Sequence, residues 1–173
     1  NFHLIKTLVT PVIVTVDNSL PLADAGSNVQ INCSNANASL SATGGVSYSW
    51  APATGLNNPS ISNPSISNLT DTVKYYVYVT GNNGCVAVDS VLVEVSFDKP
   101  FVNAGADDTI TCDISNLMLN GQTNATFYYW SPASGLSDTL VLNPIANPST
   151  AVNTYILNVV GVNGCVNSDT INV

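Results

Sequence analysis

The sequence predicts an all-β protein made of two tandem β-sandwiches. The segment Trp50-Ala51-Pro52-Ala53-Thr54-Gly55-Leu56 returns 80 residues later as Trp130-Ser131-Pro132-Ala133-Ser134-Gly135-Leu136. Short segments of alternating apolar and polar residues are separated by turn residues, and no stretch of 10 or more residues has helical periodicity. A fixed period of this length indicates an array of similar modules.

In the first repeat, strands are expected where the alternation has period two, at residues 29–32, 39–42, 46–50, 74–80 and 86–95. Residues 74–80 should place Tyr76 and Tyr78 on one face and Tyr75, Val77 and Val79 on the other. Asn83-Gly84 predicts a hairpin turn of type I′ between the last two strands, because Asn and Gly tolerate positive φ.

In the second repeat, the same pattern predicts strands at residues 109–112, 117–119, 127–130, 154–160 and 166–173. Trp50 and Trp130 are expected in the two cores, as is usual for a strand Trp of a sandwich. The alternative is that they are exposed and stack on sugars. The tyrosines of 75–78 and the aromatic run 127–130 cannot all face inward, so some should form an exposed, adhesive face.

The repeat also predicts the domain boundaries. The first sandwich should span residues 19–97 and the second 98–173, with its last strand truncated. Residues 1–18 are interpreted as the last strand of a preceding module, because 12–16 lie as far before Pro21 as 91–95 lie before Pro100. A short, proline-containing linker favours a stiff stack.

Four cysteines occupy matched places in the two repeats: Cys33, Cys85, Cys112 and Cys165. Four cysteines allow three pairings. Self-contained modules would each have one internal disulfide, Cys33–Cys85 and Cys112–Cys165. The alternative is four free thiols. A zinc site is disfavoured, because there is no CxxC and His3 is the only histidine. Disulfides indicate an oxidising compartment.

Composition narrows the function. Lys plus Arg total 3 against 11 Asp plus Glu, for a net charge of −8, which argues against binding nucleic acid. No apolar run approaches the ~18 residues of a membrane helix, so membrane insertion is not expected. A catalytic triad needs a base, and the only histidine lies outside the repeats. The chain is therefore not expected to be an enzyme.

The segments Ala23-Asp24-Ala25-Gly26, Tyr48-Ser49-Trp50, Asn83-Gly84-Cys85 and 130–136 resemble the PKD/immunoglobulin-like tandem repeats of Bacteroidetes cell-surface proteins, which include the giant gliding-motility adhesins of the SprB type. The resemblance covers about residues 20–173. It implies an immunoglobulin/PKD-like sandwich, export by type IX secretion and a place in a long surface protein. The chain departs from the PKD pattern in having no Gly-Asp-Gly after either Trp, and it shows no C-terminal sorting domain.

An Asp followed by Ser or Thr and an aliphatic residue resembles the O-glycosylation site of Bacteroidetes. The alternative is that this pattern starts strands. The candidate acceptors are Thr72, Ser90, Thr109, Thr139 and Thr170.

A weak Ca²⁺ site is a second candidate, with oxygen ligands from Asp24, Asp107 or Asp108 where modules meet. The alternative for the pair Asp107-Asp108 is a solvated loop.

These observations predict a non-catalytic structural or adhesive module of an exported cell-surface protein, an adhesin or its stalk. It would be extracellular, either attached to the outer membrane or secreted. The expected partners are neighbouring repeats of the same chain and an unidentified surface polysaccharide or protein. The alternative is an accessory or carbohydrate-binding β-sandwich module of a secreted enzyme.

Overall fold

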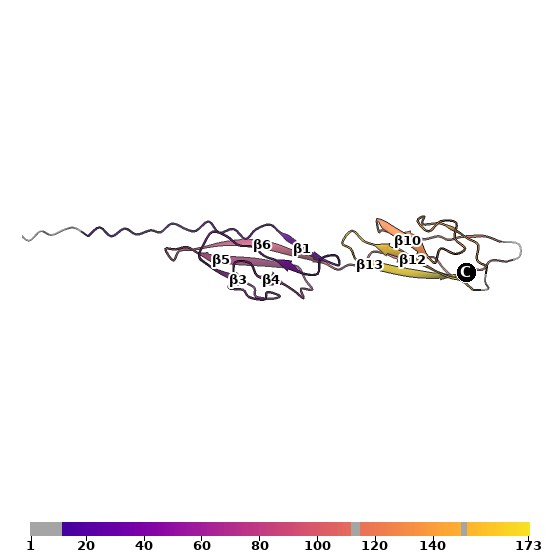
Figure 1. The fold of residues 1–173 in the computed structure, drawn as a ribbon, viewed down its shortest axis with the longest axis horizontal. Helices are drawn as coiled ribbons and strands as arrows, with labels where there is room; N and C mark the ends of the chain where they lie inside the picture. The colour runs from indigo at the N-terminus through magenta and orange to yellow at the C-terminus, as the bar shows by residue number, and fades with distance from the viewer. Residues whose placement is uncertain (1–11, 112–114, 150–151) are drawn as a thin grey trace, which may run out of the picture.

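A computed structural model describes residues 12–111, 115–149 and 152–173. Its secondary structure is entirely β within these ranges, which confirms the predicted all-β class. No helix long and apolar enough to cross a membrane occurs in the described part of the chain. Figure 1 shows two β-bodies following each other along the long axis, with residues 12–18 extending away from the first.

The first body contains six strands, with one four-stranded sheet in the order β1-β6-β5-β3 and a two-stranded sheet of β2 and β4. Strand β1 pairs parallel with β6, whereas β5 pairs antiparallel with both β6 and β3. The strands are β1 (Val29–Asn32), β2 (Ala38–Ser39), β3 (Ser47–Ala51), β4 (Ser65–Ile66), β5 (Val73–Thr80) and β6 (Val86–Ser96).

The core of the first body lies between these two sheets and follows the predicted alternation. Tyr75, Val77 and Val79 of β5 are buried, whereas Tyr76 and Tyr78 point to solvent. Trp50 is 3% exposed, and its indole N–H donates to the carbonyl of Ile61 at 3.0 Å. The core position expected for Trp50 is therefore confirmed.

The second body has its own buried cluster, but its large sheet has three strands and no parallel pair. Residues 109–111 form no strand, although the sequence predicted one at 109–112. Strands β10, β12 and β13 form an antiparallel sheet, and β8–β11 and β7–β9 form two short pairs. The strands are β7 (Val102–Asn103), β8 (Leu117–Met118), β9 (Gln122–Thr123), β10 (Phe127–Ser131), β11 (Ile145–Ala146), β12 (Thr154–Val160) and β13 (Val166–Asn172).

Matching contacts hold the two cores. Trp130 is 1% exposed and donates its indole N–H to the carbonyl of Leu142 at 3.2 Å. Tyr155 is buried and donates its hydroxyl to the carbonyl of Ser134, and Tyr75 makes the equivalent hydrogen bond to Thr54 in the first body. In both bodies the loop after the Trp strand is thereby fastened to the core by a buried tyrosine. Burial raises the pKa of both hydroxyls.

The hairpin turns differ from the predicted type I′. Gly84 donates its N–H to the carbonyl of Gly81 at 3.0 Å, and Gly81 donates to Cys85 at 2.8 Å. Gly84 has a φ of +81°, but neither Asn82 nor Asn83 has a positive φ. This is the three-residue loop in which a type I turn is followed by a left-handed glycine. The type I′ prediction was wrong because only Gly84, and not the asparagine before it, has a positive φ.

Candidate functional site: the junction between the two bodies

The junction is the short connection between β6 and β7 together with the β12–β13 hairpin of the second body. The side-chain amide of Asn163, in the hairpin, donates to the carbonyl of Ser96 at 3.3 Å and to that of Asp98 at 2.9 Å. Its Oδ1 accepts the N–H of Cys165 at 3.2 Å. One asparagine therefore ties the linker to the hairpin.

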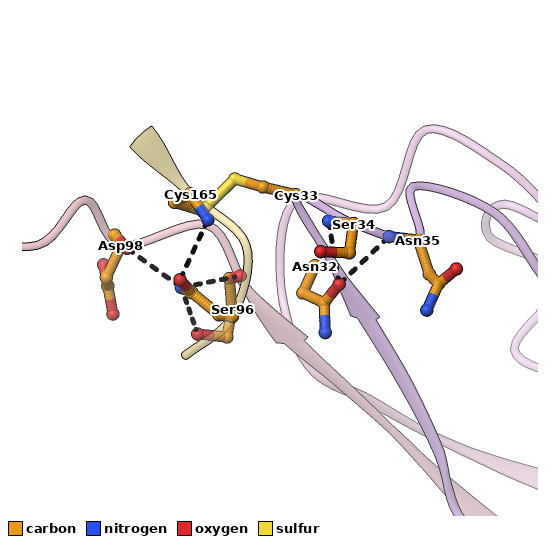
Figure 2. Close-up of a disulfide and its surroundings, with 8 residues drawn as sticks. Asn32, Cys33, Ser34, Asn35, Ser96, Asp98 and Cys165 are labelled. Atoms are coloured by element: carbon orange, nitrogen blue, oxygen red, sulfur yellow. Dashed lines mark hydrogen bonds between the residues drawn. A yellow bond between two sulfur atoms is a disulfide. The ribbon is translucent and has the colours of Figure 1, made fainter. Parts of the chain in front are cut away.

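A disulfide crosses the same junction. Cys33, directly after β1 of the first body, is bonded to Cys165 of the second, with a Cα–Cα distance of 4.9 Å (Figure 2). Cys165 is 1% exposed. Gly164 packs against Ser34 so closely that a Cβ on it would overlap the Ser34 side chain and lie 3.0 Å from its N atom. Closing a loop of 132 residues stabilises the folded chain by about 5 kcal/mol through the entropy of the unfolded state.

The predicted pairing of Cys33 with Cys85 is therefore wrong, and so is the internal disulfide expected for the first sandwich. Because β1 runs parallel to β6 and Asn32 pairs with Ser96, Cys33 lies at the end of the body where β6 finishes. Cys85 precedes the start of β6, which is 11 residues long. At ~3.3 Å per residue that strand separates the two cysteines by about 35 Å, far beyond the ~7 Å that a disulfide spans.

Cys165, Cys112 and Cys85 each differ from the predicted pairing or lie outside its test. Cys165 is bonded to Cys33, so it is not available to Cys112 as predicted. Cys112 itself lies outside the described residues. Cys85 is a free, half-buried thiol. Each cysteine of the first body thus lies at one of its ends, Cys85 where the chain enters and Cys33 where it leaves.

Two repeated aspartates fasten the N-terminal segment of each body to its sheet. Asp89 accepts the backbone N–H of Ala25, and Asp169 accepts that of Ala104, both at 2.8 Å. Hydrogen bonds from the N–H groups of Ala25 and Ser90 hold the pKa of Asp89 below its ordinary value. Asp89 recurs as Asp169 in the sequence, but the sequence analysis did not find this role.

The glycosylation candidates lie in varied surroundings. Thr72, Thr109 and Thr170 are exposed, whereas Ser90 and Thr139 are half-buried. The Thr72 hydroxyl accepts the N–H of Val95 at 3.0 Å. Modification of these residues stays a prediction. In two of the five occurrences of the Asp-Ser/Thr pattern the aspartate, Asp89 or Asp169, has a structural role, because it accepts a backbone N–H from the N-terminal segment of its body.

The Ca²⁺ candidates are each held by local hydrogen bonds. Asp24 accepts the N–H of Gly26, and Asp108 accepts that of Thr109. Asp107 accepts the side-chain amide and the N–H of Asn172, which lower its pKa. Within the described ranges no three His, Cys, Asp or Glu side chains converge. The Ca²⁺ site stays a prediction.

Aromatic side chains do gather on the outer face of each large sheet. Tyr76 and Tyr78 of β5 are 43% and 45% exposed, and Tyr78 lies opposite the exposed Val88 of β6. In the second body, Phe127 and Tyr129 of β10 are also exposed, with ring centroids 6.1 Å apart. These two outer aromatic faces correspond to the exposed tyrosines that the alternation predicted.

Ser34, Asn163 and Gly164 are the junction residues that sequence reasoning missed. The repeat of Asn83-Gly84-Cys85 as Asn163-Gly164-Cys165 was the available signal. It shows that the hairpin is preserved in both bodies, but it does not show that the second copy contacts the body before it.

Comparisons with known proteins identify no family for this chain. No family model matches the chain, and no curated protein sequence matches it. Among solved structures, the chain is similar to DIP-gamma IG1+IG2, with 12% identity, a TM-score of 0.47, and coverage of 89% of this chain and 96% of that one. It is also similar to Drosophila N-cadherin EC1-4, with 11% identity, a TM-score of 0.44, and coverage of 90% and 49%.

A third similar structure is that of the extracellular cadherin domains 3-6 of protocadherin gamma B2. The identity is 9%, the TM-score is 0.41, and the match covers 88% of this chain and 46% of that one. This chain thus spans less than half the length of that solved chain.

Proposed function

We propose that this chain is a non-catalytic structural or adhesive repeat region of a long exported cell-surface protein, an adhesin or its stalk, of the kind used in gliding motility. Residues 19–97 and 98–173 are its two β-sandwich modules, and residues 1–18 belong to a preceding module. The protein is extracellular, reaches the surface by type IX secretion and carries glycans on its Asp-Ser/Thr sites.

The clamped junction is the observation that supports this proposal. A covalent bond from Cys33 to Cys165 and the hydrogen bonds of Asn163 join two separate cores end to end. Relative motion of two modules is the default where their contact is small. Here the disulfide opposes hinging and separation, so a pull along the chain is carried from one module to the next. This is what a stalk requires.

The surface of the chain is mostly polar and carries two apolar areas, the outer aromatic faces. Charged residues make up 8% of the chain, and the net charge of −8 limits self-association. The outer aromatic faces at Tyr76/Tyr78 and Phe127/Tyr129 are the apolar surfaces that a polysaccharide or protein ligand would contact.

The exposed tyrosines also support the second candidate, an accessory or carbohydrate-binding module of a secreted enzyme. Trp50 and Trp130 lie in the cores and offer sugars no stacking surface. Tyr76 and Tyr78 remain able to stack on a sugar ring.

The location is tested with antibodies raised against the 173-residue chain. Intact cells should bind the antibody, and external protease should abolish the signal without lysis. Signal confined to lysed cells contradicts the proposal.

Adhesion is tested with beads coated with the chain. The double variant Tyr76→Ser/Tyr78→Ser should reduce binding to cells or to surface polysaccharide. The matched control is Leu140→Ser, which also removes a large exposed apolar side chain (62% exposed) but lies outside both aromatic faces. Equal loss in both variants, or in neither, contradicts the adhesive role of this face.

A further inference from the structure

We infer that the leading end of the first body is a docking face for one more repeat of the same kind, closed by a disulfide from Cys85. The leading end is formed by Asp17, Ser19, Asn83, Gly84 and Cys85. Its occupant is the trailing end of a preceding module, and the partner thiol is the cysteine of that module equivalent to Cys33. This inference rests on the proposed tandem array and adds its covalent connectivity.

The hydrogen bonds at the leading end are those of the junction already formed. The amide of Asn83 donates to the carbonyl of Ser19 at 2.8 Å and to that of Asp17 at 3.3 Å. Asn163 makes the same two hydrogen bonds to Asp98 and Ser96, each 79 residues further along. The Oδ1 of Asn83 accepts the N–H of Cys85 as that of Asn163 accepts the N–H of Cys165. The chain therefore enters the first body in the geometry with which it crosses the junction.

The space around these hydrogen bonds is equivalent too. A small cleft of about 230 Å³ at the leading end is lined by Asp17, Ser19 and the 81–83 turn. A cleft of about 210 Å³ at the junction is lined by Ser96, Asp98 and the 161–163 turn. The linker and hairpin are thus already arranged at the leading end without a module in front of them.

The two ends differ in what surrounds the hairpin glycine. A Cβ on Gly164 would collide with Ser34 of the body in front, whereas a Cβ on Gly84 would meet nothing within 4 Å. Cys165 is buried beneath its partner, but Cys85 is half-exposed and free. Gly84 and Cys85 therefore expose the surface that Gly164 and Cys165 bury against the first body.

The segment before Asp17 identifies the occupant. Val12, Ile13, Val14 and Val16 are each at least 75% exposed. Their equivalents, 79 residues later, belong to β6, where Val91 and Val93 are buried beside β5. A β-branched segment of this kind becomes buried when it completes the sheet of a module. A repeat whose last strand is residues 12–16 would end at the leading end of the first body, as β6 ends at Ser96.

The bond would form by oxidation of two thiols. The Sγ atoms of Cys85 and of the preceding module's cysteine join, and two protons and two electrons pass to a disulfide oxidant, which is reduced to two thiols. Because the contact is head-to-tail and does not close on itself, it can be repeated along a fibre. By the spacing of Cys33 and Cys165, the partner lies about 132 residues upstream of Cys85.

The test is a disulfide map of the full-length protein purified from its own cells, alkylated before unfolding and cut on the N-terminal side of aspartate. Such cleavage places Cys85 in peptide 71–88, apart from the other three cysteines. The expected result is that peptide 71–88 is linked to a peptide from a module upstream. Peptide 71–88 found alkylated, linked to peptide 108–112 or linked to a second copy of itself overturns the inference.

Two variants of the full-length protein sharpen the test. Cys85→Ser should leave the upstream cysteine as a newly alkylated thiol, without changing the Cys33–Cys165 link. Gly84→Ala should reduce the linked form of peptide 71–88. If preceding repeats are present on the cell surface but Cys85 is alkylated, the inference fails and the proposed function stands. If the antibody finds no protein at the surface, the proposed function itself fails.

Discussion

Replacing Trp130 with alanine should destabilise the second body and leave the stability of the first body nearly unchanged. Trp130 is 1% exposed at the centre of the second core, and its indole N–H is bonded to Leu142. Truncating a fully buried Trp costs about 3–5 kcal/mol, against a total of about 5–15 kcal/mol for a small domain. For a body of this size the melting temperature of the second core should fall by at least about 12 °C.

The assay uses the two tryptophans of the chain. In Trp130→Ala the remaining Trp50 reports the first core by fluorescence, while calorimetry follows both cores. We expect one transition at a lowered temperature and a second, at which the Trp50 signal changes, within a few degrees of its original value. The control is Tyr129→Ala, whose side chain is 39% exposed and should cost about 1 kcal/mol or less. If the Trp50 signal moves with the lowered transition, the two cores are one cooperative unit and the reasoning is refuted.

Three further predictions follow from single contacts. Asp89→Asn should lower the free energy of unfolding by about 1–2 kcal/mol at pH 7, because it weakens the hydrogen bond to Ala25. Because the folded pKa of Asp89 is depressed, this difference should persist above pH ~4 and shrink as the pH falls through the folded pKa. Urea unfolding above and below that pKa measures the difference, and a constant value would contradict the account. Gly164→Ala should slow formation of the Cys33–Cys165 bond during refolding in glutathione, because the added Cβ collides with Ser34. Gly84→Ala in the 173-residue chain should lose only the ~1 kcal/mol of stability that a left-handed alanine costs, and it should form the bond at the original rate. Equal oxidation rates in the two variants would contradict the Ser34 contact. Cys33→Ser should keep two separate melting transitions but lower their temperatures, because the stabilisation from closing the 132-residue loop is lost. It should also broaden the distribution of module orientations in small-angle scattering, and an unchanged scattering profile would show that the disulfide does not stiffen the junction.

Local patterns predicted most of the architecture. Period-two alternation identified β5, β6, β12 and β13, and it separated the buried Tyr75 from the exposed Tyr76. The matched positions of Trp50 and Trp130 indicated two cores. These features depend on neighbours within one strand, and a single sequence carries that information.

The junction could not be predicted in this way, because it depends on the relative direction of distant strands. The parallel pairing of β1 with β6 places Cys33 at the trailing end of the first body, and neither strand's own sequence reveals that pairing. The assumption of self-contained modules then selected Cys85 as partner of Cys33. The matched positions of the cysteines fit both pairings, since a bond to the next module would also recur once in each repeat.

The most direct test of the clamped junction is a disulfide map of the 173-residue chain. Alkylation under native conditions, followed by cleavage before aspartate, separates the four cysteines into peptides 24–70, 71–88, 108–112 and 138–168. The account predicts that peptide 24–70 is linked to peptide 138–168 and that peptide 71–88 is alkylated at Cys85. A link between peptides 24–70 and 71–88 would mean that Cys33 is bonded to Cys85 within one module, and it would contradict the account.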